Sequence, residues 1–172
     1  MSCKTGGCSS EGSSGCNKKN TFDWFADIPI ASNYNFNIIE VSFKQGARKG
    51  FYRNDKKIDL YKGDLVLVEA AQGYDIGEVS LKGELVKLQM KKKKVKDTPE
   101  NVRKIIKKAT ELHKDELKEL RSRERDIMIK ARVISRELKL NMKVGDIEFQ
   151  GDGKKATIYY TSEGRIDFRE LV

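Results

Sequence analysis

Apolar and polar residues alternate in two short runs near the end of the chain. The first run lies within residues 146–149 and the second within residues 156–160. A period of two is typical of half-buried strands. The Gly-Asp-Gly loop at residues 151–153 suits a connection between antiparallel neighbours. The pattern therefore predicts a β-hairpin.

A further helix is predicted directly after this hairpin. Gly164 can adopt the positive φ of a tight turn, and Asp167 and Glu170 have the spacing of a capping box. About one helical turn remains before Val172, and one turn is not stable by itself. We expect that the chain is truncated within this last helix; the alternative is that something else completes the helix.

A long amphipathic helix is predicted before the hairpin, over residues 110–140. Its apolar stripe recurs at alternating spacings of four and three residues and includes one carboxylate. The members of the stripe are Leu120, Glu124, Ile127, Ala131, Ile134 and Leu138. We expect this helix to lie across the hairpin.

Residues 98–109 allow two interpretations. Thr98 and Pro99 have the character of an N-cap and a first helical residue, which would give one helix over residues 98–140. Alternatively, residues 102–109 form a strand and Thr110 caps a shorter helix. With that strand the order becomes β-α-β-β-α, which is an incomplete ferredoxin-like unit without its last strand.

The first half of the chain contains short segments rich in β-forming residues, separated by turns. These segments are residues 36–43, a return at residues 51–52, residues 65–69, residues 74–79 and a continuation at residues 85–90. Such a series is typical of a small antiparallel barrel. We therefore predict an α+β protein: a small antiparallel β-barrel-like part, followed by a long amphipathic helix packed on a β-hairpin. The expected domains are a disordered Cys/Gly/Ser-rich head at 1–20, a β-rich domain at 21–97 and an α+β domain at 98–172.

The composition describes a charge-rich chain. Of its 172 residues 35% are charged, the formal net charge is +9, and the sequence pI is about 9.4. A basic balance favours polyanionic partners such as RNA or DNA. No apolar run approaches the roughly 18 residues of a membrane helix, and no hydrophobic signal segment follows the N-terminus. We expect a cytoplasmic protein without membrane insertion.

A basic run in the middle of the chain is the candidate nucleic-acid contact. It comprises Lys91, Lys92, Lys93, Lys94 and Lys96, followed by Arg103 and Lys104. These side chains could follow a phosphate backbone, but no aromatic residue is interleaved to stack on bases. The alternative is a solvated strand edge whose lysines discourage edge pairing.

The cysteines of the chain all lie in the head, at Cys3, Cys8 and Cys16. Thiolates on a Gly/Ser-rich segment could bind a soft metal or an iron–sulfur cluster. Their spacing matches no standard zinc or ferredoxin pattern, and a fourth ligand is missing. Incidental thiols on a disordered tail are the alternative.

No catalytic constellation is visible in the sequence. His113 is the one histidine, and it lies in a highly charged helical stretch where a surface role is favoured. Carboxylates such as Asp64, Glu69, Asp75 and Glu78 are interpreted as turn and strand-end residues. We expect that the protein is not an enzyme.

Several segments resemble the RicT (YaaT) family, bacterial proteins that share a conserved region with the yeast polymerase-suppressor protein. The most specific are LNMK at residues 140–143, DIEF at 146–149 and YYTSEGRIDFRELV at 159–172. KGDLVLVE at 62–69, Gly73, GEV at 77–79 and residues 103–110 match the same family. The Cys-rich head before Phe22, Asp23 and Trp24 is similar to Bacteroidota members.

The resemblance implies a non-catalytic regulatory subunit. RicT assembles with two small helical partners, RicA and RicF, into a complex that carries iron–sulfur clusters, such as 4Fe-4S, and works with the endoribonuclease RNase Y in mRNA maturation and turnover. The family's own Cys motifs lie beyond the point where this chain ends. Direct nucleic-acid binding through residues 91–108 is the alternative function.

Overall fold

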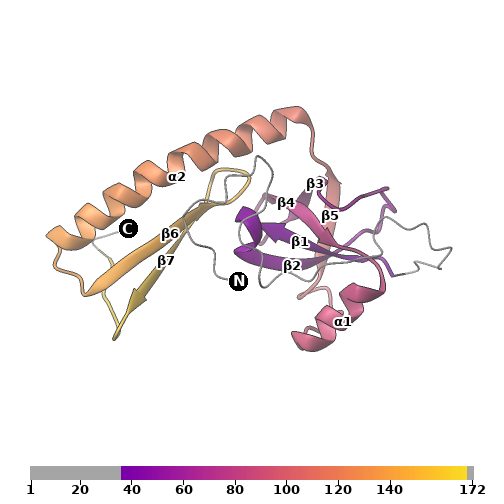
Figure 1. The fold of residues 1–172 in the computed structure, drawn as a ribbon, viewed down its shortest axis with the longest axis horizontal. Helices are drawn as coiled ribbons and strands as arrows, with labels where there is room; N and C mark the ends of the chain where they lie inside the picture. Colours follow the sequence, from indigo (N-terminus) through magenta and orange to yellow (C-terminus); the bar gives the residue numbers. More distant parts are fainter. Residues whose placement is uncertain (1–35, 170–172) are drawn as a thin grey trace, which may run out of the picture. The chain divides into compact units, whose positions relative to one another are not determined.

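The computed structural model describes residues 36–169, which form two compact units (Figure 1). The first unit contains the described residues up to Glu69 together with Gly77–Lys108. The second contains Ala70–Ile76 and the described residues from Ala109 onward. The head at 1–20, with its predicted disorder, lies outside the described residues.

The first unit is a closed five-stranded barrel, as predicted for this part of the chain. Its strands are β1 (Ile38–Phe43), β2 (Arg48–Arg53), β3 (Leu65–Glu69), β4 (Tyr74–Leu81) and β5 (Arg103–Lys108), in the order β1-β2-β5-β3-β4. A 3-10 turn, η1 (Lys44–Gly46), joins β1 to β2. The pairs β1–β2, β1–β4 and β3–β5 are antiparallel. The pair β2–β5 is parallel, so the barrel is not purely antiparallel.

β-Branched and aromatic side chains fill the barrel. Val41, Val66 and Val68 are fully buried, and Phe43 meets Tyr52 edge to face at a centroid distance of 6.0 Å. These residue types pack well on a pleated surface and bury large apolar area. Burial of this kind supplies the main favourable term for a domain of this size.

Residues 85–90 were predicted to continue the strand pattern, and this prediction is wrong. They belong to helix α1 (Glu84–Lys92). Val86 and Met90 are four residues apart and both buried, so one helical face explains the run as well as a strand does. A short apolar run does not by itself distinguish the two structures.

Strand β5 confirms the strand interpretation of residues 102–109 and excludes the single helix over 98–140. Its partners, however, are barrel strands. Val68 lies opposite Ile105 in the antiparallel ladder, and Tyr52 lies opposite Arg103 in the parallel one. The described residues therefore do not form the ferredoxin-like arrangement, and the division between the compact units follows Lys108 instead of residue 97.

The second unit contains the predicted helix on a hairpin. Helix α2 (Glu111–Glu137) packs on β6 (Met142–Phe149), which pairs antiparallel with β7 (Ala156–Ser162). Ala131, Val144 and Ile147 form its buried cluster. Ile134 of the predicted stripe is 40% exposed, and Ser135 is buried in its place. The reason is that the next residue after Ala131 on the buried face of the helix is four positions later, at Ser135.

Polar side chains of α2 also hold β6. Glu124, 7% exposed, accepts a hydrogen bond from the Phe149 N–H at 3.1 Å. The Arg132 Nε donates to the Val144 carbonyl at 3.0 Å, next to the bulge between Val144 and Asp146. The carboxylate in the apolar stripe is thus explained, since a buried backbone donor needs a partner.

The predicted last helix lies mostly outside the described residues. Within them, Asp167 accepts from the Arg169 N–H at 3.1 Å, as an N-terminal capping residue does.

Replacement of Gly77 in the barrel should be destabilising. A Cβ there would lie 2.4 Å from Val41 Cγ1 and 2.8 Å from Phe43 Cε1. We expect Gly77→Ala to lower the free energy of unfolding by about 1–3 kcal/mol, the usual effect of overpacking. Urea titration measures the change. Gly164→Ala is the control because no described residue lies within 4 Å of its Cβ position, and equal stability of the two variants would refute the close packing.

Candidate functional site

The basic run predicted to contact nucleic acid lies on the barrel unit, at the end of α1. Lys91 and Lys92 form the last turn of α1, Lys93 is its C-cap, and Lys94 has a positive φ of 54°. These lysines and Lys96 are all exposed. The helix therefore ends in a cluster of cations, which complements the negative end of the helix dipole.

The structure brings this turn close to the start of β5. Arg53 forms an ion pair with Asp97 and lies opposite Lys104 in the β2–β5 ladder. Arg103 lies opposite Tyr52 one residue earlier. The two parts of the predicted basic stretch are thus neighbours on one side of the barrel.

Two of the predicted cations already have acidic partners. Lys93 lies 3.6 Å from Glu40, and Lys104 lies 3.2 Å from Asp55. Four other lysines form no ion pair within the part of the chain that the structure describes. They are Lys91, Lys92, Lys94 and Lys96. These four are the exposed lysines of the predicted set that remain for a phosphate backbone.

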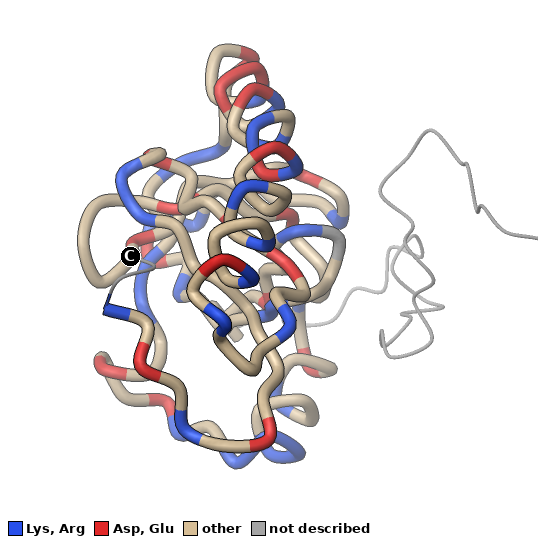
Figure 2. The backbone as a smooth tube through the Cα atoms, turned by 90° about the vertical axis from the view of Figure 1, so that its left-hand side faces the viewer, with Lys and Arg blue, Asp and Glu red and all other residues tan. Residues whose placement is uncertain are grey.

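Charge is distributed unequally between the two units. The described residues of the barrel unit contain 18 Lys and Arg against nine Asp and Glu, whereas those of the second unit contain 14 against 13. Figure 2 shows acidic and basic positions following one another closely along α2. The excess positive charge therefore belongs to the barrel.

Glu40 is a buried carboxylate that the alternating pattern did not reveal. It is 2% exposed on β1 and lies 3.2 Å from Lys49 Nζ as well as close to Lys93. Since a buried charge is tolerated only with partners, the two lysines explain its place. Lys93 thus joins the end of α1 to β1 and is less suited to an external ligand.

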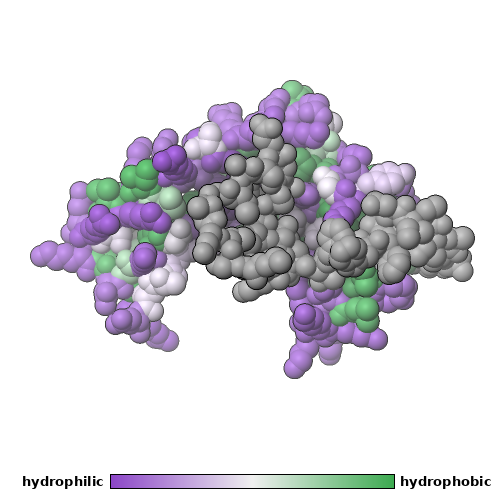
Figure 3. Space-filling view, in the orientation of Figure 1, coloured by the Kyte–Doolittle hydropathy of each residue, from purple (hydrophilic) through white to green (hydrophobic). Residues whose placement is uncertain are grey.

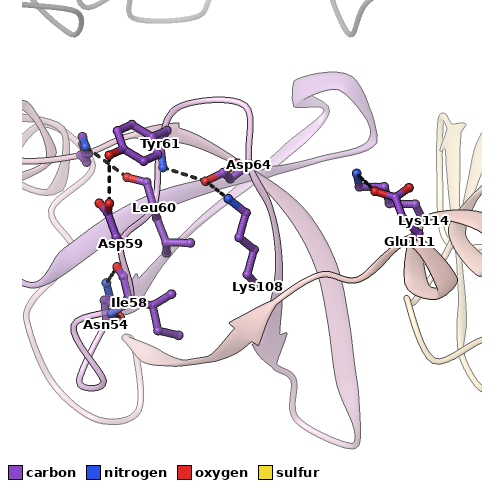
Figure 4. A network of polar contacts seen from close by, with 10 residues as sticks. Asn54, Ile58, Asp59, Leu60, Tyr61, Asp64, Lys108, Glu111 and Lys114 are labelled. Carbon is purple, nitrogen blue, oxygen red and sulfur yellow. Dashed lines mark hydrogen bonds and ion pairs between the residues drawn. The ribbon is translucent and has the colours of Figure 1, made fainter.

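A cavity of about 540 Å³ opens beside the connection from β2 to β3. Asn54, Ile58, Leu60 and Lys82 are among its lining residues. The Asn54 side chain accepts from the Ile58 N–H at 3.0 Å and donates to the Ile58 carbonyl at 2.8 Å (Figure 4). Lys82 donates to the Leu60 carbonyl at 3.1 Å. These polar groups stabilise the connection itself, which favours a structural role for them.

Tyr61 and two carboxylates form a network in the same connection (Figure 4). The exposed Tyr61 hydroxyl donates to Asp59 at 2.9 Å, and this hydrogen bond, with the Asp59 charge, raises the pKa of Tyr61. Asp64 accepts from the Tyr61 N–H at 2.9 Å and from Lys108 Nζ at 2.8 Å. Asp64 therefore ties the loop to the end of β5, consistent with its interpretation as a turn residue.

In the second unit, Asp75 of β4 has a role that its interpretation as a turn or strand-end residue did not indicate. It is 6% exposed, and its Oδ1 accepts from the Gly151 N–H at 2.9 Å and from the Ile76 N–H at 2.8 Å. Gln150 Nε2 donates to the Gln72 carbonyl at 2.6 Å. A Cβ on Gly151 would lie 2.6 Å from Ile76 N, so glycine is required for this approach.

His113 takes part in the start of α2. Its Nδ1 contacts Thr110, accepting from the Thr110 N–H at 3.3 Å, as the third residue of a capping box does. Its ring also meets Tyr74 edge to face, with centroids 6.4 Å apart. Burial, together with the charges of Glu116 and Asp152, raises the pKa of Tyr74. The contacts of His113 are those of a structural residue.

The predicted metal ligands Cys3, Cys8 and Cys16 lie outside the described residues. Within residues 36–169, no group of three or more His, Cys, Asp or Glu residues is arranged to hold a metal ion. No helix in this same range is long and apolar enough to cross a membrane.

These observations define an α+β protein with a basic five-stranded barrel and a helix packed on a hairpin. Residues 103–172 match the family model described as the PSP1 C-terminal conserved region. The chain is 34% identical over 140 residues to the stage 0 sporulation protein YaaT of Bacillus subtilis. The aligned region covers 80% of this chain and 47% of YaaT. The chain is 32% identical over 158 residues to an uncharacterized protein of Schizosaccharomyces pombe, covering 80% of this chain and 21% of that protein.

The PSP1 match and the similarity to YaaT support the RicT (YaaT) family, with the PSP1 region, for this chain. The chain spans less than half the length of each of these two relatives. No solved structure matches it.

The Tyr61–Asp59 hydrogen bond gives a direct titration test. We expect Asp59→Asn to lower the pKa of Tyr61 toward its ordinary value, because the carboxylate favours the protonated phenol. Tyrosinate absorbance measured against pH, with Tyr61→Phe to identify the Tyr61 component, reports the shift. Asp55→Asn, which removes the partner of Lys104, should leave that component unchanged. A Tyr61 titration insensitive to Asp59→Asn would contradict the assigned contact.

Proposed function

We propose that the chain is a non-catalytic regulatory subunit of a RicT-like complex that modulates ribonuclease-dependent mRNA maturation and turnover. The observation that carries this proposal is the similarity to YaaT, a sporulation protein, over 80% of the chain. In this proposal the protein works in the cytoplasm, through contacts with RicA/RicF-like helical proteins and a ribonuclease such as RNase Y.

The outer face of α2 supports a docking role. Ile129 and Val133 are 49% and 47% exposed and lie four residues apart, on one side of the helix. Figure 3 shows hydrophobic atoms among hydrophilic ones over α2. Apolar side chains at this spacing suit contact with a partner helix, which buries them on binding.

An iron–sulfur cluster stays a prediction for this chain. All of its cysteines lie in the head, so the described residues supply no thiolate ligand. Cys3, Cys8 and Cys16 are the candidate ligands here.

The docking role predicts a specific loss of partner binding. We expect Ile129→Asp to weaken binding of the full chain to RicA/RicF-like proteins by about 10-fold or more, because a charge would be buried at the contact. Isothermal titration calorimetry measures the affinity. Leu88→Asp is the matched control, since Leu88 is an exposed apolar residue on α1.

Two results would contradict the docking role. One is the absence of binding by the unmodified chain. The other is equal weakening by both variants.

Direct binding of RNA or DNA is the second candidate function. It is favoured by the charge excess of the barrel unit and by four exposed lysines at the end of α1, which form no ion pair with any residue in the range 36–169. Binding through four phosphate contacts should weaken about 100-fold between 50 and 200 mM salt.

A quadruple Lys→Gln variant at Lys91, Lys92, Lys94 and Lys96 tests this function. We expect it to lose affinity for a fluorescent single-stranded RNA, measured by anisotropy, and to lose most of the salt dependence. The control replaces four exposed lysines of the second unit, namely Lys118, Lys139, Lys143 and Lys154. Absence of RNA and DNA binding by the unmodified chain at low salt eliminates this candidate.

A further inference from the structure

Strand β7 has an outer edge with unusual properties. In the described residues, the sheet of the second unit has two strands, so β7 has a neighbour on one side, β6. Its seven residues, ATIYYTS, contain no charge and no proline, and six of them are exposed. A two-stranded sheet is marginally stable alone, and exposed sheet edges normally carry protective lysines, prolines or bulges.

The backbone of β7 shows which peptide groups face this edge. The Lys155 carbonyl accepts from the Gln150 N–H at 2.8 Å, so Lys155 directs its carbonyl toward β6. Peptide groups alternate in direction along a strand. The residues whose N–H and C=O groups point to the outer edge are therefore Ala156, Ile158, Tyr160 and Ser162.

We propose that this edge pairs with the same edge of a second copy of the chain, so that two β7 strands form the centre of a four-stranded antiparallel sheet. The pairing would be isologous, with the two-fold axis passing between the Tyr159 residues of the two copies. The occupant of the edge is thus the protein itself.

Charge complementarity favours this register over the two registers centred one residue away. With Tyr159 at the centre, Lys155 at one end of β7 lies opposite Glu163 of the second copy, and this happens twice by symmetry. Thr157 then lies opposite Thr161. Both pairs are favourable across antiparallel strands.

The neighbouring registers lack this match. Centring on Tyr160 would place Lys155 opposite Arg165, which is repulsive. Centring on Ile158 would place Lys155 opposite Thr161, and Glu163 opposite Gly153. Of these three registers, the one centred on Tyr159 therefore pairs Lys155 and Glu163, the charges directly next to the strand, most favourably.

Disulfide trapping tests the register in the full chain, with Cys3, Cys8 and Cys16 replaced by serine. The axis places the two copies of residue 159 in a pair without hydrogen bonds, where Cα atoms are about 4.5 Å apart, within the range for a disulfide. We expect Tyr159→Cys to give a covalent dimer under mild oxidation and Thr157→Cys to remain monomeric on a non-reducing gel. The reverse pattern would overturn the register.

Charge reversal tests the same pairing without any cysteine. Lys155→Glu or Glu163→Lys alone should raise the dimer dissociation constant by about 5- to 10-fold, because each creates two like-charge pairs. The double reversal should restore it to within about twofold of the original. Sedimentation velocity over a concentration series measures the constant.

Tyr160→Pro should prevent pairing at the outer edge of β7, because it removes an N–H that points outward. It leaves the hydrogen bonds between β7 and β6 intact. Tyr160→Ala is its control, and circular dichroism checks that both variants fold. The proposal is overturned if the unmodified chain stays monomeric at all concentrations, if single and double reversals behave alike, or if a partner protein occupies the edge while the chain is monomeric.

Discussion

The barrel depends on one strand, β5, which hydrogen-bonds on both of its edges. It runs parallel to β2 and antiparallel to β3, and its Ile105 is 2% exposed in the barrel core. Without β5, the edges of β2 and β3 would be open, and the core around Val66 and Val68 would face water. The barrel is therefore completed by a strand that is distant in sequence from β2 and β3 and follows α1.

Strand β5 also shows which structural elements the PSP1 region contains. The PSP1 match begins at Arg103, the first residue of β5, and continues through α2 and the hairpin. The conserved region is thus not confined to the helix-and-hairpin unit, because its first strand belongs to the barrel. Strand β4 is also divided between the two units. Its first residues belong to Ala70–Ile76, which is grouped with α2, and its remaining residues, Gly77–Leu81, belong to the barrel unit. In the second unit, the buried Asp75 holds the hairpin loop at Gly151.

The two units differ in the partners that they suit. The barrel unit carries the excess positive charge, and four lysines at the end of α1 form no ion pair with other described residues, so its charge favours polyanions. The second unit is nearly neutral and exposes apolar residues on α2 and an uncharged strand edge. The proposed contacts with proteins and with nucleic acid can therefore be tested separately.

Local patterns predicted much of the fold. The run LVLVE at residues 65–69, the stripe of α2 and the alternation in the closing hairpin each determine one structure, and all three elements formed. Residues 85–90 were mistaken for a strand because their apolar spacing suits both periods. The partners of β5 could not be predicted, since pairing between distant segments leaves no local pattern. The burial of Glu40 and Asp75 was missed because carboxylates are usually exposed and their partners are distant in sequence.

The placement of β5 is the central claim, and nuclear Overhauser contacts in the full chain test it most directly. The account predicts cross-strand contacts between Ile105 and Val68 and between Arg103 and Tyr52. Contacts of residues 103–108 with β6 or β7 would instead indicate a ferredoxin-like sheet and would contradict it.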